Sequence, residues 1–238
     1  MSTLENLRQQ LGKQKPRITQ NAFSTGCAEL DRLLPHGGLR RGCVMEWVGS
    51  KSLCEAALIS LLVMQQAMAD AQTLLLIDPT QSLYAPTLVS MGLDLDRVLY
   101  VTPRSKRDVL WACDQGLRCP AVGVVFCLQP EGDATTFRRF QIAAEDHGTI
   151  GCFVFDQRRQ PHRCWGDVRL GVESLPRGDD DAMSLRVDVQ RSTRGHVGDY
   201  LMLEVTSQGQ FHVPPVRHKK PYSLRLVSAL ADSATRFA

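Results

Sequence analysis

The sequence predicts a three-layer α/β fold with a mostly parallel central sheet, helices on both faces, and antiparallel edge strands near the C-terminus. Through residues 44–156, short and continuously apolar segments alternate with longer helical patterns. That alternation is typical of buried parallel strands joined by helical crossovers. From residue 168 to residue 205, apolar and polar residues alternate within segments that Gly/Asp-rich turns separate. This second pattern is typical of antiparallel strands with one solvent-exposed face.

Length and composition narrow the class of protein. The 238 residues suffice for one sizeable domain with short appendages, and a hydrophobic content of 43% is ordinary for a packed protein. The balance of 28 basic against 25 acidic residues gives a net charge of +3, which is too weak to indicate a nucleic-acid partner by itself. We see no apolar run that would span a bilayer and no signal peptide, so we expect a cytoplasmic protein.

The chain divides into three predicted parts. Residues 1–20 are polar with leucines at helical spacing, which predicts an N-terminal amphipathic helix on a tether. Residues 21–213 form the α/β core. Residues 214–238 begin with Pro214-Pro215 and a basic run and end in a short apolar stripe, so we expect a linker and a partner-docking tail there.

The lead-in to the first strand, residues 23–45, carries the most specific motif of the chain. A Ser-Thr-Gly turn precedes a short helical pattern, and glycines follow that permit tight turns of the backbone before the strand. This segment resembles the lead-in of the RecA family, s-T-G-x-x-x-L-D-x-x-L-x-x-G-G-[LI]-x-x-G. The matching residues are Thr25, Gly26, Leu30, Asp31, Leu34, Gly37, Gly38, Leu39 and Gly42. The resemblance implies a RecA-like core.

A degenerate phosphate-binding loop follows the strand at residues 44–48. A working loop, G-x-x-x-x-G-K-[ST], cradles phosphates with backbone N–H groups, neutralises them with lysine and holds magnesium with a hydroxyl. Counting from Gly49, the second glycine position holds Cys54, the lysine position Glu55 and the hydroxyl position Ala56. A carboxylate about 4 Å from a phosphate is repelled by roughly 4 kcal/mol at an effective dielectric near 20. We therefore expect this site to bind no nucleotide cofactor and no metal.

One rescue of the loop remains open. Gly49-Ser50-Lys51-Ser52 contains a G-x-K-S, in which Lys51 would replace the missing lysine within a shortened loop. The bulky residues 46–48 before it argue against that rescue, because such a loop needs small, flexible residues.

Further nucleotide positions are altered along the next strands. A helix is expected at residues 56–71 and a strand at residues 73–77, which ends in Asp78 at the edge where ligands bind in such sheets. Related recombinases have Asp-x-Glu here, whereas Asp78-Pro79-Thr80 lacks the glutamate. The expected strand at residues 121–128 ends in Phe126, Cys127 and Leu128, where an ATPase of this family has a magnesium-organising aspartate.

The segment after the strand at residues 151–156 contains the candidate nucleic-acid contacts. A helix is expected before it at residues 135–147, with Phe137, Phe140 and residues 142–144 facing the core. By the resemblance, Gln157 lies where recombinases keep a glutamine that senses the γ-phosphate. The basic turn that follows has the residue types that contact phosphate and stack on bases: Arg158, Arg159, Arg163 and Trp165. A solvated basic turn is the other interpretation.

The eight cysteines show no C-x-x-C spacing and sit mostly in apolar runs, so we expect buried reduced thiols rather than a zinc site or disulfides. No Ser/His/Asp or Cys/His nucleophile set is visible, and no catalytic residue is assigned.

With the lead-in kept and the nucleotide chemistry lost, the chain most resembles the ImuA family within the RecA-like superfamily. That resemblance implies a non-catalytic accessory role in SOS-induced, error-prone translesion DNA synthesis. The implied partners are an ImuB-type homologue of Y-family polymerases, and RecA or an error-prone replicative-type polymerase. Three alternatives stay open: a deviant ATPase using Lys51, Asp78 and Gln157, a single-strand DNA-binding protein using the basic turn, and a cell-division inhibitor resembling SulA.

Overall fold

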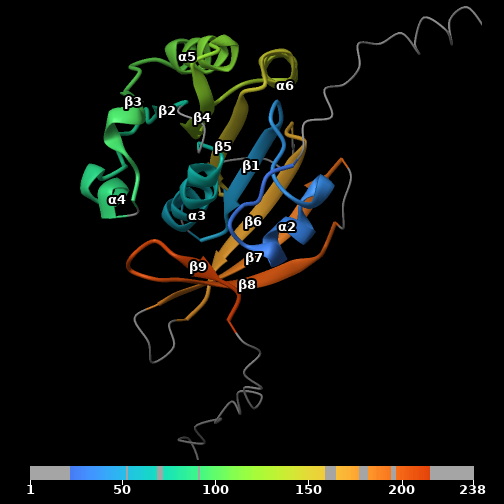
Figure 1. Cartoon of the computed structure of the whole chain (residues 1–238). Coiled ribbons are helices and arrows are strands. Elements are labelled where there is room, and N and C mark those ends of the chain that lie inside the picture. Colours follow the sequence, from blue (N-terminus) through green and yellow to red (C-terminus); the bar gives the residue numbers. More distant parts are fainter. Residues whose placement is uncertain are drawn as a thin grey trace, which may run out of the picture.

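A nine-stranded sheet with the order β3-β2-β4-β5-β1-β6-β7-β8-β9 forms the centre of the computed structural model (Figure 1). The model describes residues 22–51, 53–68, 72–90, 92–158, 165–176, 182–193 and 197–214. The predicted N-terminal helix and C-terminal tail therefore lie outside the described residues. The strands are β1 (Val44–Gly49), β2 (Thr73–Ile77), β3 (Val98–Val101), β4 (Val122–Leu128), β5 (Ile150–Asp156), β6 (Val168–Ser174), β7 (Met183–Ser192), β8 (Tyr200–Val205) and β9 (Phe211–His212).

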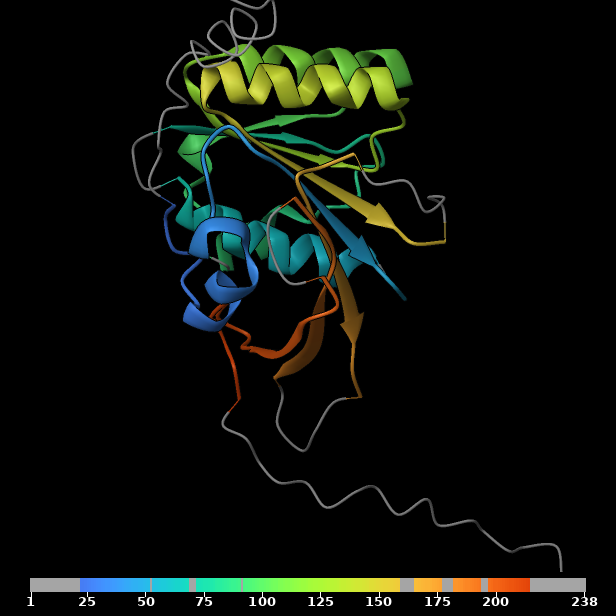
Figure 2. The ribbon, with the colours of Figure 1, turned by 90° about the vertical axis from the view of Figure 1, so that its right-hand side faces the viewer.

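Helices cover both faces of the parallel part, which confirms the predicted three-layer α/β architecture. One face carries α2 (Ala28–Leu33), the 3-10 turn η1 (Pro35–Gly37), α3 (Leu53–Gln66) and α4 (Ala85–Ser90), followed by the 3-10 turn η2 (Leu95–Arg97). The other face carries α5 (Lys106–Arg118) and α6 (Ala134–His147), which lie side by side in Figure 2. Each face buries its own apolar cluster, because successive residues of a strand point to opposite sides of the sheet.

The C-terminal strands form an antiparallel extension, as the alternating pattern predicts, with one exception. β7, β8 and β9 pair in antiparallel fashion, but β6 is parallel to β1 while pairing antiparallel with β7. The expectation that residues 168–172 form an antiparallel strand was thus only half right. β5 and β6 both run parallel to β1. Between them the chain must therefore return from the carboxyl ends of the strands to their amino ends.

Two details of the helices differ from the sequence expectation. α3 begins at Leu53 and ends at Gln66, which is earlier at both ends than the predicted 56–71. Ile142, expected to face the core from α6, is 43% exposed, whereas Phe137, Phe140, Ala143 and Ala144 are buried as predicted. None of the described helices is both long and apolar enough to cross a bilayer.

Candidate functional site: the degenerate nucleotide site

The loop between β1 and α3 is short and fixed at its start. Gly49 lies between Asp156 of β5 and Val172 of β6, and its carbonyl accepts the N–H of Gln157 at 3.0 Å. The N–H of Ser50 donates to the carbonyl of Val172 at 2.9 Å. Because α3 begins at Leu53, only residues 50–52 connect the two elements, and Ser52 lies outside the described residues.

The start of α3 presents a carboxylate where a phosphate-binding loop has its lysine. Cys54 and Glu55 lie in the first turn, and Ala56 is fully buried in the helix. Cys54 is exposed and Glu55 is half-buried. The Oε2 atom of Glu55 is shielded from solvent and has no hydrogen-bond partner in the described structure. The negative charge of that carboxylate would repel a phosphate brought to this end of the helix.

Lys51 is held at the carboxyl end of β6. Its Nζ lies 3.0 Å from Oε1 of Glu173 and donates to the carbonyl of Ser174 at 3.3 Å. The lysine side chain remains 62% exposed, so this ion pair is weak. The geometry gives the amine a local partner and does not direct it over the start of α3.

Asp78 lies where the sequence predicted, at the carboxyl end of β2, but its carboxylate is engaged in internal hydrogen bonds. Oδ1 accepts the N–H and hydroxyl of Thr80 at 3.1 and 3.0 Å. Oδ2 accepts the N–H of Leu83 at 2.8 Å and the hydroxyl of Tyr100 at 3.0 Å. The side chain is fully buried. Asp78 therefore holds the loop that leads to α4 and links that loop to β3.

The pKa of Tyr100 depends on the hydrogen bond between its hydroxyl and Asp78. Partial burial, together with the hydrogen bond to Asp78 and its negative charge, raises the pKa of Tyr100 to about 12. That pKa lies above the ordinary value of about 10. The stability that the protonated Tyr100 hydroxyl gives to the folded protein is therefore present below pH 10 and is lost as the pH rises through 12. We expect one tyrosine to titrate near pH 12 in a phenolate absorbance titration, and Tyr100→Phe to remove that step. A titration unchanged by Tyr100→Phe would contradict the assignment.

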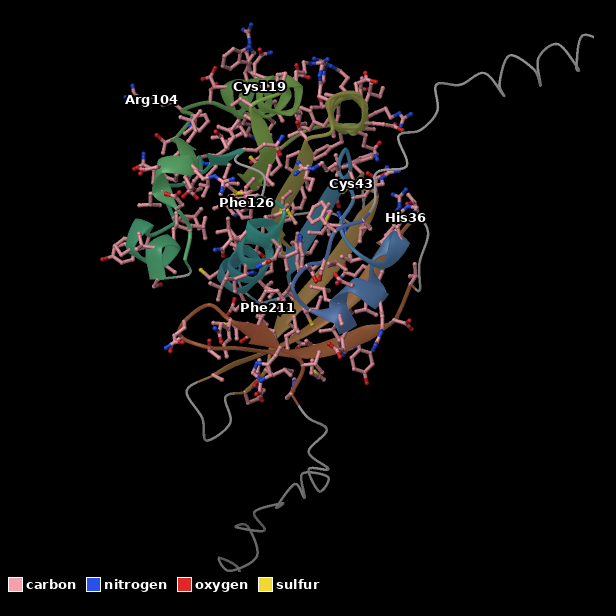
Figure 3. All side chains as sticks on the ribbon, in the orientation of Figure 1. His36, Cys43, Arg104, Cys119, Phe126 and Phe211 are labelled. Carbon is pink, nitrogen blue, oxygen red and sulfur yellow. The ribbon has the colours of Figure 1, made fainter. Side chains whose placement is uncertain are left out.

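The end of β4 is apolar. Phe126, Cys127 and Leu128 are all buried, and Figure 3 shows Phe126 inside the molecule. Burial raises the pKa of the Cys127 thiol well above its usual value, so this group stays uncharged. The strand thus offers no carboxylate at the position where the family has its magnesium-organising aspartate.

The two candidate nucleic-acid residues that the structure describes after β5, Arg158 and Trp165, do not lie together. Arg158 folds back on Asp156, with its guanidinium 2.8 Å from Oδ2, beside the end of β1 at Gly49. Trp165 lies near the opposite end of β1, where its ring stacks on Phe137 with centroids 6.3 Å apart and planes at 15°. Gln157 is exposed next to Arg158, while Arg159 and Arg163 fall outside the described residues.

Sequence reasoning missed a buried ion pair that fixes the Trp165 end of this crossover. Glu46 of β1 is fully buried, and its Oε2 accepts Nε of Arg169 of β6 at 2.8 Å. Its Oε1 accepts the N–H groups of Trp165 and Gly166, both at 2.7 Å. The sequence did contain a signal for this pair, since Glu46 and Arg169 each interrupt an otherwise apolar strand. Charged residues are almost never fully buried unless they are paired, so each indicates a partner.

Most of the described cysteines are buried, as the sequence predicts. Cys27, Cys43, Cys113, Cys127 and Cys152 are buried and Cys54 is exposed. Within the described ranges, no group of three or more His, Cys, Asp or Glu side chains is placed to hold a metal ion.

Known proteins resemble this chain in sequence and in fold. The chain is 25% identical to protein ImuA of Caulobacter vibrioides (strain NA1000 / CB15N) over 237 residues, which covers 91% of this chain and 93% of that protein. The fold also matches that of the RadB recombinase, with a TM-score of 0.62 at 15% identity over 81% of this chain and 99% of that one. The chain has a RecA-like fold and resembles ImuA along nearly its whole length.

The resemblance to RecA proteins covers less of each chain. Protein RecA of Gluconobacter oxydans is 30% identical over 112 residues, or 47% of this RecA-like chain and 32% of that protein. Protein RecA of Haemophilus ducreyi is 34% identical over 104 residues, or 44% of this chain and 28% of that protein. No family model matches the sequence.

Proposed function

We propose that the protein is a non-catalytic, RecA-like accessory factor of SOS-induced translesion DNA synthesis in the cytoplasm. It acts through contacts with an ImuB-type polymerase homologue and with RecA or an error-prone polymerase. Similarity to ImuA over 93% of that protein's length supports this role. The observation that carries the non-catalytic part is the engagement of Asp78, whose carboxylate is buried and hydrogen-bonded to Thr80, Leu83 and Tyr100.

The chemistry of the whole site agrees with this role. A phosphoryl-transfer site needs a cation for the phosphates and a carboxylate free to organise magnesium or water. Here Lys51 pairs with Glu173, Asp78 holds a loop, and Glu55 introduces repulsion. A RecA-like core without that chemistry still offers exposed sheet edges and helix faces for binding other proteins.

Co-purification tests the partners. We expect an affinity-tagged copy of the full chain to retain the ImuB-type protein from the same genome when the two are co-expressed, and the complex to persist without added nucleotide. The matched control is an unrelated RecA-fold ATPase carrying the same tag. If neither the ImuB-type protein nor RecA is retained above that control, the proposed role is wrong.

A further inference from the structure

A pocket lies at the amino ends of β1 and β6, away from the degenerate nucleotide site at the carboxyl end of β1. Its volume is about 210 Å³, and it lies between the sheet and residues 34–40 of the lead-in. Met45 of β1, Val168 of β6 and Cys43, which precedes β1, line its sheet side. Drug-sized ligands occupy pockets of roughly 300–1,000 Å³, so this one suits a smaller molecule. We call it the lead-in pocket.

Backbone hydrogen bonds hold the two sides of the lead-in pocket in place. Asp167 precedes β6; its N–H donates to the carbonyl of Val44 at 2.8 Å, and its Oδ2 accepts the N–H of Val44 at 2.8 Å. The N–H of Thr193, which follows β7, donates to the carbonyl of Asp167 at 3.0 Å. On the lead-in side, Leu39 and Phe23 exchange two backbone hydrogen bonds of 2.9 Å. The walls of the pocket are therefore formed before any ligand arrives.

Two side chains of opposite charge line the lead-in pocket without pairing with each other. Arg40 is half-buried, and its guanidinium makes no hydrogen bond or ion pair with any residue that the structure describes. Asp167 is also half-buried, and only its Oδ2 is bonded, to Val44, within the same described ranges. The guanidinium and Oδ1 of the carboxylate are therefore both available to a ligand.

The Cys43 thiol indicates that these two charges lie close together. Burial first, and then the negative charge of Asp167, raise the pKa of Cys43 to about 12, while the positive charge of Arg40 opposes the rise. Because the effect of a charge on a pKa weakens with distance, both charged groups lie near the sulfur atom. The thiol itself is uncharged at neutral pH and adds a small, weakly polar surface to the pocket.

His36 lies at the rim of the lead-in pocket in a backbone conformation that residues other than glycine rarely adopt. Its φ is 71°, in the left-handed region, and the side chain is exposed. Figure 3 shows His36 and Cys43 on the same side of the molecule. Glycine would hold this turn with less strain, so the retained imidazole indicates a use for the side chain.

We propose that the lead-in pocket binds a small zwitterion of the α-amino-acid class with an aliphatic side chain. Arg40 pairs with the ligand carboxylate, His36 donates a hydrogen bond to the same group, and Asp167 accepts the ligand ammonium. The aliphatic side chain packs against Leu34 and Leu39, which are buried and line the pocket. This site goes beyond the proposed accessory function and does not depend on it.

Other ligands match the lead-in pocket less well. A phosphate or nucleotide would bring several negative charges next to Asp167. A nucleobase needs a stacking partner, and no Phe, Tyr or Trp is among the described residues that line the pocket. A metal ion would need a cluster of ligands that the described part of the chain does not contain. A partner protein would have to insert a side chain carrying both charges, and no standard side chain does so.

Thermal unfolding and calorimetry of the full chain with each standard L-amino acid test the proposal. We expect an aliphatic amino acid such as leucine to bind saturably and to raise the unfolding midpoint. Two analogues of leucine isolate its charges: isoamylamine lacks the carboxylate, and isocaproate lacks the ammonium. Each should bind at least about tenfold more weakly, because each leaves one charged side chain of the pocket unpaired.

Variants of the lining residues locate the binding. Arg40→Gln and Asp167→Asn should each weaken it about tenfold or more, and asparagine keeps an oxygen for the N–H of Val44. Thr193→Trp should obstruct the pocket from its exposed rim. The matched control is Arg32→Gln, which changes an exposed arginine of α2 outside the pocket and should bind normally. If Asp167→Asn does not fold, Arg40→Gln and Thr193→Trp still decide the matter.

His36→Gly separates binding from folding. Glycine relieves the left-handed backbone conformation and removes the imidazole. We therefore expect weaker binding of the amino acid by several-fold, while the unfolding midpoint of the ligand-free protein stays the same or rises.

Three results would overturn the proposal. The first is no saturable binding of any standard amino acid at millimolar concentration, as for a pocket that holds only water. The second is binding of isocaproate or inorganic phosphate as tight as that of the amino acid, which would indicate a simple anion site. The third is amino-acid binding that Arg40→Gln and Thr193→Trp both leave unchanged.

Discussion

Replacing Glu46 with alanine is expected to lower the free energy of unfolding by about 3–5 kcal/mol, because the buried Arg169 would lose the carboxylate that pairs with it. The substitution also removes the acceptor for the N–H groups of Trp165 and Gly166. Urea unfolding followed by tryptophan fluorescence measures the change. Glu46→Ala/Arg169→Met should lose less stability than Glu46→Ala alone, since it removes both charges from the interior.

An exposed ion pair supplies the control for this prediction. Lys106 and Glu131 are 75% and 64% exposed, so Lys106→Ala should change stability by no more than about 1 kcal/mol. A loss as small for Glu46→Ala would mean that the β1–β6 pair does not hold the crossover in place.

Replacing Phe137 with alanine is expected to lower the free energy of unfolding by about 3–5 kcal/mol, the usual cost of emptying a large buried aromatic site. Phe137 is fully buried and contacts four rings: Phe140 and Phe153 edge-on at 5.7 and 5.6 Å, Phe155 at 6.3 Å, and Trp165 in a stack. Chemical denaturation measures the loss, and a red shift of native tryptophan emission should accompany it as Trp165 gains exposure.

Two further variants bracket this effect. Phe137→Leu keeps most of the side-chain volume, so it should lower the free energy of unfolding by much less than Phe137→Ala does. Ile142→Ala changes a partly exposed residue of the same helix and should stay within about 0.5 kcal/mol. Equal losses for Phe137→Ala and Ile142→Ala would refute the aromatic cluster as the support for Trp165.

Much of the fold was predictable because its signals are local. Apolar segments alternating with helical patterns gave the parallel strands, and the lead-in motif gave the RecA-like order. The β6 direction was harder to predict, since the alternating pattern of residues 168–172 describes a half-exposed strand without stating its partner. β6 takes its direction from pairing with β1, and β5 runs parallel to the same strand, so the two cannot be joined by a tight turn.

The positions of the candidate site were predictable, whereas their contacts were not. The sequence placed Asp78 at the end of β2, but its partner Tyr100 lies 22 residues away, and periodicity carries no information on such pairs. Glu46 and Arg169 are 123 residues apart and meet only through the β1–β6 register. Arg158 and Trp165 are close in sequence, yet they lie near opposite ends of β1. Arg158 pairs with Asp156, which lies beside Gly49, whereas the N–H of Trp165 donates to Glu46.

Titration with a fluorescent ATP analogue and magnesium, from micromolar to millimolar nucleotide, tests the central claim most directly. Wild type and Lys51→Ala are compared, since Lys51 is the amine nearest the start of α3 that a shortened loop would use. The account predicts no saturable binding in either protein, because Glu55 repels phosphate and Asp78 is engaged elsewhere. Tight, magnesium-dependent binding by wild type that disappears in Lys51→Ala would contradict the account and indicate an ATPase.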